Sequence, residues 1–160
     1  MPDGLAYGIV MQVNPEENKR LVERFYEQVW ARGNVQFAEE VFADDYVRHD
    51  LRPTQPAPGA AGQAQVAKAF RAAFPDLQWR VDLLVAEGDL VAARWTASGT
   101  HTGTWAGLAA TGRRAEFSGV NIFRFDATGK VVEIWNHRDD LGLQEQLGAA
   151  VHGGAPPAEP

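Results

Sequence analysis

Five polar residues stand together at the end of an otherwise apolar segment, in the run NHRDD at 136–140. An amide, an imidazole, a guanidinium and two carboxylates can together donate, accept and exchange protons. Strand-like alternation places Val132, Ile134 and Asn136 on one face of this segment. If that apolar face is inward, Asn136 enters a cavity, where its amide can bond a ligand. In the alternative, the strand simply leaves the sheet and Arg138 pairs with a neighbouring aspartate at the surface.

Tyr26 presents the same choice on a helix. It lies on a stripe of apolar residues that recur every three or four positions between residues 21 and 30. A buried phenol needs a hydrogen-bond partner. Tyr26 therefore either packs in the core with its hydroxyl bonded at the rim, or points into a pocket where the hydroxyl stabilises an oxyanion.

Several other chemistries find little support in the sequence. The chain contains no cysteine, which excludes disulfides, a thiolate nucleophile and a cysteine zinc site. Neither serine lies in a G-x-S-x-G motif, so a serine triad is not expected. His49, His101 and His137 show no zinc-motif spacing and come from separate segments. We therefore expect no metal site, since dispersed histidines rarely converge on one ion.

Two helices are predicted near the N-terminus. Asn14 is a suitable N-cap for the first, Pro15 fits the first helical position, and Gly33 stands where a left-handed residue ends such a helix. Asn34 can cap a second, shorter helix whose apolar face continues to Phe42. Both helices have one apolar side and must pack against another element.

A loop, a third helix and a set of strands are predicted next. The loop at 52–62 is rich in proline and glycine, and the helix at 63–74 is ended by Pro75. A short helix or turn is expected at 141–148. Alternating residues predict four strands, at 79–87, 90–103, 115–125 and 131–138. The order predicts an α+β fold, in which a strongly curved sheet wraps around three N-terminal helices like a cone.

Length, charge and aromatic content limit what the chain does. Its 160 residues suit one domain at 14–148, preceded by an extension at 1–13 and followed by a disordered tail at 149–160. With 15 basic and 21 acidic residues, the net charge of −6 argues against a nucleic-acid or membrane partner. We expect a cytoplasmic protein. Its five Trp, eight Phe and three Tyr either fill a core or line a pocket for a flat apolar ligand.

Five stretches follow one another between about residues 16 and 148: NKRLVERFYEQVWARGN, FADDYVRHD, AAFPDLQWRVDLLVAEGDLVAARWTASGTHTGTWAGLAATGRR, FSGVNIFRFDATGKVVEIW and DDLGLQEQLG. In this order they resemble the SnoaL-like polyketide cyclase family, or ester cyclases, of the nuclear transport factor 2-like superfamily. The resemblance implies a cone-shaped α+β barrel with an apolar pocket, a hydrophobic small-molecule ligand and a homodimer formed through the sheet. Characterised cyclases of the family close a ring by an intramolecular aldol step without a metal or organic cofactor.

The resemblance also suggests roles for individual residues. Asn136 stands at the position of the cyclases' acid/base aspartate, although an amide cannot abstract a proton. The later family aspartate matches Asp139, and His137 is another candidate base. Tyr26 matches a tyrosine that related steroid isomerases use to hold an enolate, and Asp50 lies near their base. The expected ligand-binding residues are Tyr26, Trp30, Tyr46, His49, Phe70, Phe74, Trp95, His101, Phe117, Asn121 and Phe123.

Three functions therefore remain open. The chain is an enzyme of cyclase, isomerase or hydration type acting on a hydrophobic carbonyl compound, with Asn136 and Tyr26 as donors. Alternatively, it binds a small apolar ligand without catalysis, or it serves as a dimerising module. A cavity that contains Asn136 would favour the first two functions over the third.

Overall fold

The computed structural model describes residues 14–52 and 55–149. The predicted extension at 1–13 and all but the first residue of the predicted tail lie outside these residues. The helices are α1 (Pro15–Phe25), which continues as a π-helical turn (Tyr26–Ala31), α2 (Ala38–Val41), α3 (Ala60–Ala73) and α4 (Asp140–Gln146). The strands are β1 (Phe42–His49), β2 (Gln78–Glu87), β3 (Leu90–Thr100), β4 (Arg114–Phe125) and β5 (Val131–Arg138).

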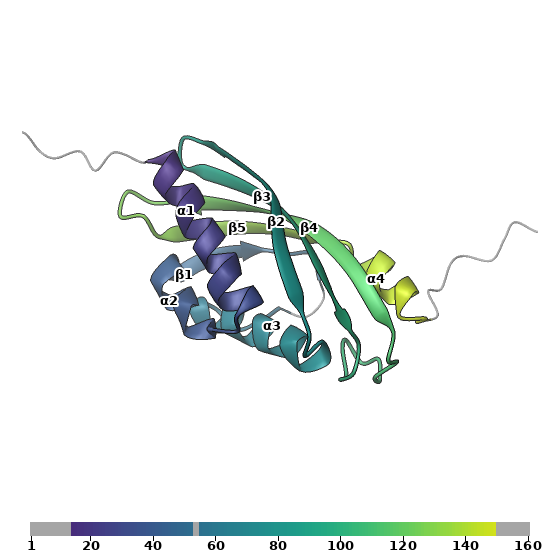
Figure 1. Ribbon diagram of the computed structural model, residues 1–160. Helices are drawn as coiled ribbons and strands as arrows, with labels where there is room; N and C mark the ends of the chain where they lie inside the picture. Colours follow the sequence, from purple (N-terminus) through teal and green to yellow (C-terminus); the bar gives the residue numbers. More distant parts are fainter. Residues whose placement is uncertain (1–13, 53–54, 150–160) are drawn as a thin grey trace, which may run out of the picture.

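Helices α1, α2 and α3 lie on one side of a single five-stranded sheet of order β1-β5-β4-β3-β2 (Figure 1). Strands β2 to β5 are antiparallel neighbours, whereas β1 runs parallel to β5. The sheet curves toward the helices, and α4 lies at the opposite end of the sheet from the start of α1. The predicted α+β class is confirmed, and the sheet has one strand more than the four predicted from the sequence. None of the helices in the described residues combines the length and apolarity needed to cross a membrane.

The first helix begins and ends as predicted. Asn14 caps it, because its Oδ1 accepts the backbone N–H groups of Glu16 and Glu17 at 3.1 and 3.3 Å. Gly33 follows the helix with a φ of +77°, in the left-handed region that glycine occupies most easily. The last turn is π-helical, and the backbone N–H of Arg32 accordingly bonds the carbonyl of Glu27, five residues earlier.

The second predicted helix is shorter than its sequence pattern suggested. A 3₁₀ turn (Val35–Phe37) and the single turn of α2 replace it, and Phe42 already begins β1 with a ψ of 141°. Asn34 does not cap this segment; its side chain instead donates to Gln28 Oε1 at 3.3 Å. Strand β1 was not predicted, because the run FADDYVRH looks too polar for a buried strand.

Helix α3 begins three residues before its predicted start and packs against the π-helical turn that follows α1. It follows Gly59, whose φ is +71°. From α3, Arg71 Nη1 donates to the backbone carbonyls of Trp30 and Ala31, both at 3.1 Å. These bonds satisfy carbonyls at the end of the π-helical turn and fix α3 against it.

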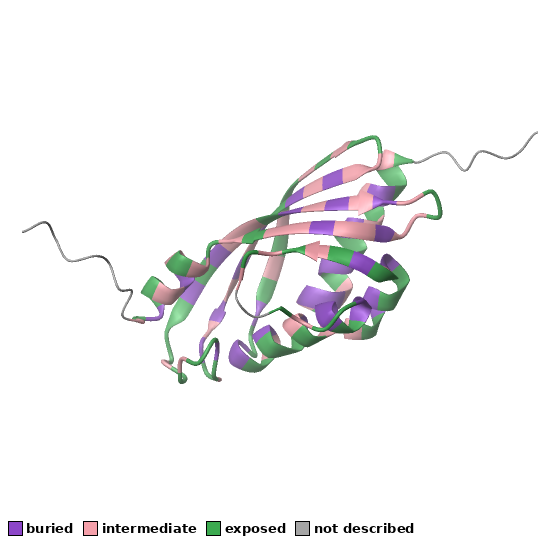
Figure 2. Cartoon of the chain, turned by 180° about the vertical axis from the view of Figure 1, so that it is seen from behind, coloured by how far each residue is buried: buried purple, intermediate pink, exposed green. Residues whose placement is uncertain are grey.

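Residues alternate between buried and more exposed positions along the strands (Figure 2). In β5, Ile134 and Asn136 face the helices. This agrees with the interpretation in which Asn136 enters a cavity. Val132 does not share that face, because the register with β4 shifts between Arg124 and Phe125 and brings Val131 inward. The prediction for Val132 is therefore wrong by one residue.

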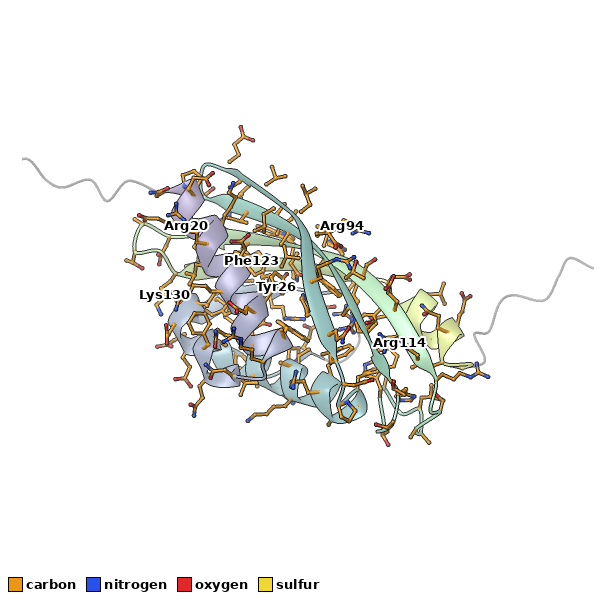
Figure 3. The ribbon with its side chains drawn as sticks, in the orientation of Figure 1. Arg20, Tyr26, Arg94, Arg114, Phe123 and Lys130 are labelled. Carbon is orange, nitrogen blue, oxygen red and sulfur yellow. The ribbon has the colours of Figure 1, made fainter. Side chains whose placement is uncertain are left out.

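Strand β4 has a glycine, Gly119, at the position where the Trp95 side chain of the neighbouring strand lies against it. Gly119 pairs with Trp95 in the register of β3 and β4. A Cβ atom at Gly119 would lie only 2.5 Å from Trp95 Cζ2, so any other residue would displace the indole. Figure 3 shows Tyr26 and Phe123 between α1 and the sheet, whereas Arg20 and Lys130 project at the periphery.

Candidate active site

Two adjoining hollows lie between the helices and the inner face of the sheet. The inner cavity has a volume of about 20 Å³, room for one water-sized group. The outer cavity has a volume of about 520 Å³, within the range that binds small organic ligands. Arg48, Val66 and Arg138 line both hollows. The outer cavity also has apolar walls from α3 and the following loops, formed by Ala69, Phe70, Trp105 and Ala106.

Indole rings form one wall of the inner cavity. The ring of Trp79 lies between those of Trp30 and Trp95, with centroids 4.5 and 4.1 Å away. Tyr26 stacks on Trp79 at 5.7 Å. Trp79 Nε1 is buried and has no hydrogen-bond partner among the described residues. The wall therefore offers one unused donor within an aromatic surface.

A chain of hydrogen bonds runs through the inner cavity to the outer one. Asn121 Oδ1 accepts from the Tyr26 hydroxyl at 3.1 Å and from Trp95 Nε1 at 2.6 Å. Asn121 Nδ2 then donates to Asn136 Oδ1 at 2.7 Å. Asn136 Nδ2 in turn donates to Asp50 Oδ2 at 3.2 Å. Asn136 is thus a link between a neutral, buried group of side chains and a carboxylate.

Tyr26 remains protonated at this position. Burial raises the pKa of its phenol well above 10.0. Its proton already serves the bond to Asn121. The hydroxyl therefore supports Asn121 directly and has no second proton to donate to an oxyanion.

Asp50 is held as a carboxylate by the groups around it. Its side chain is 4% exposed. Burial alone would raise its pKa, but the backbone N–H of Arg52, the charges of Arg52 and Arg48 and the amide of Asn136 hold the pKa below 3.8. The Arg52 N–H and Arg48 Nη2 each lie 3.1 Å from an Asp50 oxygen, and Arg52 Nη1 also pairs with it. Arg48 Nε is buried without a partner among the described residues.

A second ion-pair group completes the charged end of the site. Arg52 Nε donates to Asp140 Oδ2 at 2.6 Å, and Arg138 Nε pairs with the other Asp140 oxygen. Burial would raise the pKa of Asp140, but Arg138 and Arg52 hold it below 3.8. The guanidinium of Arg138 lies over the ring of Phe70 at 4.5 Å, in a cation–π arrangement. Burial lowers the pKa of Arg138, although Asp140 opposes this effect.

Seven of the residues named from the sequence line one of the two cavities: Tyr26, Trp30, Asp50, Phe70, Trp95, Asn121 and Asn136. They come from the π-helical turn after α1, α3 and three strands, together with the segment after β1. The structure therefore brings together four of the polar residues that the sequence singled out, Tyr26, Asp50, Asn121 and Asn136.

Two candidate bases lie elsewhere. Asp139 is exposed and caps α4, where its Oδ1 accepts the backbone N–H of Gly142 at 2.8 Å. His137 is exposed and lies on the outer side of β5, opposite in parity to Asn136. Of the three candidate bases, only Asp50 lines the outer cavity, whereas His137 lines a third hollow of about 700 Å³ that also contains Asp50 and Asn136.

The three histidines from separate segments do not converge. His49 stacks on Trp135 at 4.9 Å and pairs with Glu133 at 2.7 Å, outside the two cavities. His101 is fully buried behind Phe74, and its Nδ1 accepts from the Thr111 backbone N–H at 3.3 Å. Within residues 14–52 and 55–149, no three His, Asp or Glu side chains are grouped as metal ligands.

The remaining aromatic candidates pack in the core. Phe74, Phe117 and Phe123 are at most 3% exposed and line neither cavity. Tyr46 is also buried, and its hydroxyl accepts from Gln63 Nε2 at 3.2 Å. Both interpretations of the aromatic surplus therefore apply, since the indoles around Trp79 line the cavity and these rings fill the core.

The sequence analysis did not place the arginines or Asp140 at the site. One of its alternatives had Arg138 pair with a neighbouring aspartate at the surface, and that pair, with Asp140, lies at the wall of the outer cavity. Arg138 follows Ile134 and Asn136 by the same alternation, so extending that pattern by two residues would have placed it inward. Arg48 was missed because β1 itself was missed. Asp140 and Arg52 give no such signal, since both lie just beyond strand ends.

Known proteins resemble this chain in sequence and in structure. A family model described as SnoaL-like polyketide cyclase matches residues 20–147. No curated protein sequence matches. TsrD from Streptomyces laurentii is 28% identical with a TM-score of 0.77, over 86% of this chain and 99% of that chain. AclR, a putative hydroxylase from Streptomyces galilaeus, is 30% identical with a TM-score of 0.74, over 84% and 98%. IdmH, a putative polyketide cyclase from Streptomyces antibioticus, is 30% identical with a TM-score of 0.68, over 83% and 99%.

Proposed function

Since this chain belongs to the SnoaL-like polyketide cyclase family, we propose that it is an enzyme that performs acid/base chemistry on a hydrophobic carbonyl compound. The reaction is an aldol cyclisation or a related isomerisation or hydration, and it needs no cofactor. The observation that carries this proposal is the buried Asp50 carboxylate, which lies beside the guanidinium of Arg48 at the wall of an aromatic cavity.

Asp50 is the base in this proposal. Its lowered pKa keeps it ionised at neutral pH but also makes it a weaker base, so proton abstraction depends on donors that stabilise the enolate. Asp50 takes a proton from the carbon next to a carbonyl, and the electron pair moves onto the carbonyl oxygen. In a cyclisation, the enolate carbon then bonds to a second carbonyl carbon of the same molecule, and Asp50 returns the proton to the new alkoxide.

The enolate oxygen needs donors at the same place. Arg48 Nε and Trp79 Nε1 are buried donors that find no partner within residues 14–52 and 55–149, and both residues line the inner cavity. A ligand oxygen that enters this cavity, which has room for one water-sized group, would accept from them. The negative charge therefore develops beside a guanidinium and away from water.

Asn136 is a positioning residue in this proposal. It stands where the cyclases have an aspartate, and it donates to Asp50 while it accepts from Asn121. An amide that is bonded on both sides fixes the orientation of the carboxylate without carrying a proton itself. The base has thus moved from the end of β5 to the segment after β1.

One feature favours binding without turnover. Asp50 Oδ2 accepts from Arg48, Arg52 and Asn136, whereas Oδ1 accepts only the backbone N–H of Arg52. Oδ1 therefore keeps one lone pair that could take a proton, but the four bonds weaken the carboxylate as a base. A protein that keeps all of them would hold the ligand and leave its protons in place.

Deuterium exchange at the methyl group of 2-acetylnaphthalene in D2O, followed by proton NMR, distinguishes the two functions. We expect the protein to accelerate exchange and Asp50→Asn to reduce the acceleration by about 100-fold or more. Asp45→Asn, at an exposed aspartate on the preceding strand β1, is the matched control and should exchange at the wild-type rate. Calorimetric binding of this ketone without accelerated exchange would instead establish a binding protein. Loss of exchange in Asp139→Asn would overturn Asp50 as the base.

We also propose that two copies associate through the outer face of the sheet. An apolar row crosses four strands there, since Val85 pairs with Ala92, Ala92 with Ile122 and Ile122 with Trp135. Val85 is 54% exposed, although it is apolar. Sedimentation should show a dimer that Val85→Glu weakens, while Arg20→Glu on the helical side has no effect. A wild-type monomer at 100 μM would contradict this.

A further inference from the structure

The charges that line the outer cavity do not balance. Three arginines, Arg48, Arg52 and Arg138, face two carboxylates, Asp50 and Asp140. The site therefore carries a net charge of +1, while the whole chain carries −6. A positive charge in a half-buried, apolar-walled cavity is costly unless an anion balances it.

Among the described residues, Arg48 and Arg138 each make a single side-chain hydrogen bond, so both keep unused donors. Arg52 reaches both carboxylates, and Arg48 pairs with Asp50. Arg138 makes one hydrogen bond among the described residues, from Nε to Asp140. Its Nη1 and Nη2 atoms are therefore free to form a two-pronged contact with another group.

The surroundings of Arg138 prepare it for such a contact. Its side chain is only 10% exposed and lies over the ring of Phe70, with the ring of Trp105 centred 6.0 Å away. Stacking holds the planar guanidinium in one orientation. Burial removes most of the water that would compete with a ligand for its N–H groups. An arginine held in this way recognises a planar carboxylate more specifically than a lysine would.

We propose that the outer cavity binds an aromatic or polycyclic carboxylate, with the carboxylate paired to Arg138 and the rings against Phe70 and Trp105. This inference rests on the proposed function only in calling the ligand a substrate; the binding itself does not depend on catalysis. A single negative charge neutralises the cavity, whereas a phosphate dianion would leave it with a net charge of −1. A monocarboxylic acid therefore fits better than a phosphate ester.

Calorimetric titration with 2-naphthoate and with 2-naphthamide tests the proposal. The two probes have the same rings and nearly the same shape but differ in charge. We expect the acid to bind about tenfold or more tightly than the amide at pH 7, because charge-assisted bonds contribute more than neutral ones. Equal affinities for the two probes in the wild-type protein would overturn the proposal.

Variants then locate the contact. Arg138→Gln should remove the preference for the acid, and Arg138→Lys should keep only part of it, since an ammonium cannot form the two-pronged contact. Arg20→Gln, an exposed arginine on α1, should keep the full preference. An acid preference that survives Arg138→Gln would overturn the role of Arg138. If Arg138→Gln does not fold, the Arg138→Lys protein decides the assignment: an unchanged preference overturns it.

The same experiment separates this inference from the proposed function. A preference for naphthoate that depends on Arg138, together with no exchange of 2-acetylnaphthalene, would support carboxylate binding and refute the enzyme. Exchange that depends on Asp50, together with equal binding of acid and amide, would support the enzyme and refute carboxylate binding.

Discussion

The two ends of the hydrogen-bond chain through the cavity differ in what they leave unpaired. At the inner end, Tyr26 and Trp95 donate to one oxygen of Asn121, and no ionised group takes part. At the outer end, Asp50 and Arg138 belong to a charged group with one more cation than anion. At the inner end, the hydrogen bonds to Asn121 hold the side chains in place. At the outer end, the unbalanced positive charge leaves room for a negatively charged ligand.

The largest expected effect is at the outer end. Asp50→Asn removes the charge that pairs with Arg48 and Arg52, and we expect it to reduce the free energy of unfolding by about 3 kcal/mol, because buried cations are left uncompensated. Urea denaturation measures this loss. Asp45→Asn should change stability by less than about 0.5 kcal/mol. If Asp50→Asn lowers the free energy of unfolding by no more than Asp45→Asn does, the charged end contributes little to stability.

The inner end should respond nearly as strongly when its acceptor is removed. Asn121→Leu leaves the Tyr26 hydroxyl and Trp95 Nε1 without a partner, which should cost about 2 kcal/mol in urea denaturation. Adding Tyr26→Phe to this variant should recover part of the loss, because it removes one unsatisfied group. If the two changes are simply additive, the bond between these side chains is not what stabilises the inner end.

Stability should depend on pH differently at the two ends, with an acid limit set by the outer end and an alkaline limit set by the inner end. Asp50 and Asp140 have lowered pKa values, so their contribution is complete above pH 3.8 and is lost as the pH falls through the values in the folded protein. Tyr26 has a raised pKa, so its contribution is complete below pH 10.0 and is lost as the pH rises through its value in the folded protein. Chemical denaturation across pH measures both limits. Asp140→Asn should weaken the acid dependence and leave the alkaline limit unchanged.

The smallest expected effect is that of Tyr26→Phe alone. It removes one hydrogen bond, while Trp95 still donates to Asn121, so we expect a loss of about 1 kcal/mol. Because the proposed enolate donors are Arg48 and Trp79, exchange of 2-acetylnaphthalene should fall by less than about tenfold. A fall as large as that of Asp50→Asn would make Tyr26 a catalytic residue and remove the distinction between the two ends.

Local patterns in the sequence predicted the inner end better than the outer one. The alternation of β5 placed Ile134 and Asn136 correctly and failed at Val132, because a one-residue shift in pairing leaves no mark in a single strand. The apolar stripe of α1 placed Tyr26 against the sheet. These residues are positioned by their own elements, whose period can be read directly.

The outer end depends on segments that are distant in sequence. Its charges come from β1, the segment after it, β5 and α4, and the bond from Arg52 to Asp140 spans 88 positions. Charged residues in β1 conceal a strand, because strand signals are apolar and alternating. No periodicity predicts that Arg48, Arg52 and Arg138 meet, and so the net charge of the cavity is visible only in three dimensions.

The parallel pairing of β1 with β5 has a consequence for the order of folding. Strands β2 to β5 can zip together through successive neighbours, whereas β1 must bring Phe42 to Val131 across a long stretch of chain. Such closures are slow, because the entropy of the intervening chain is lost before any contact forms. We therefore expect β1 to dock late and its amide protons to exchange sooner than those of β3 and β4. The segment that carries Arg48 and Asp50 would then be the last part of the molecule to assemble and the first to open.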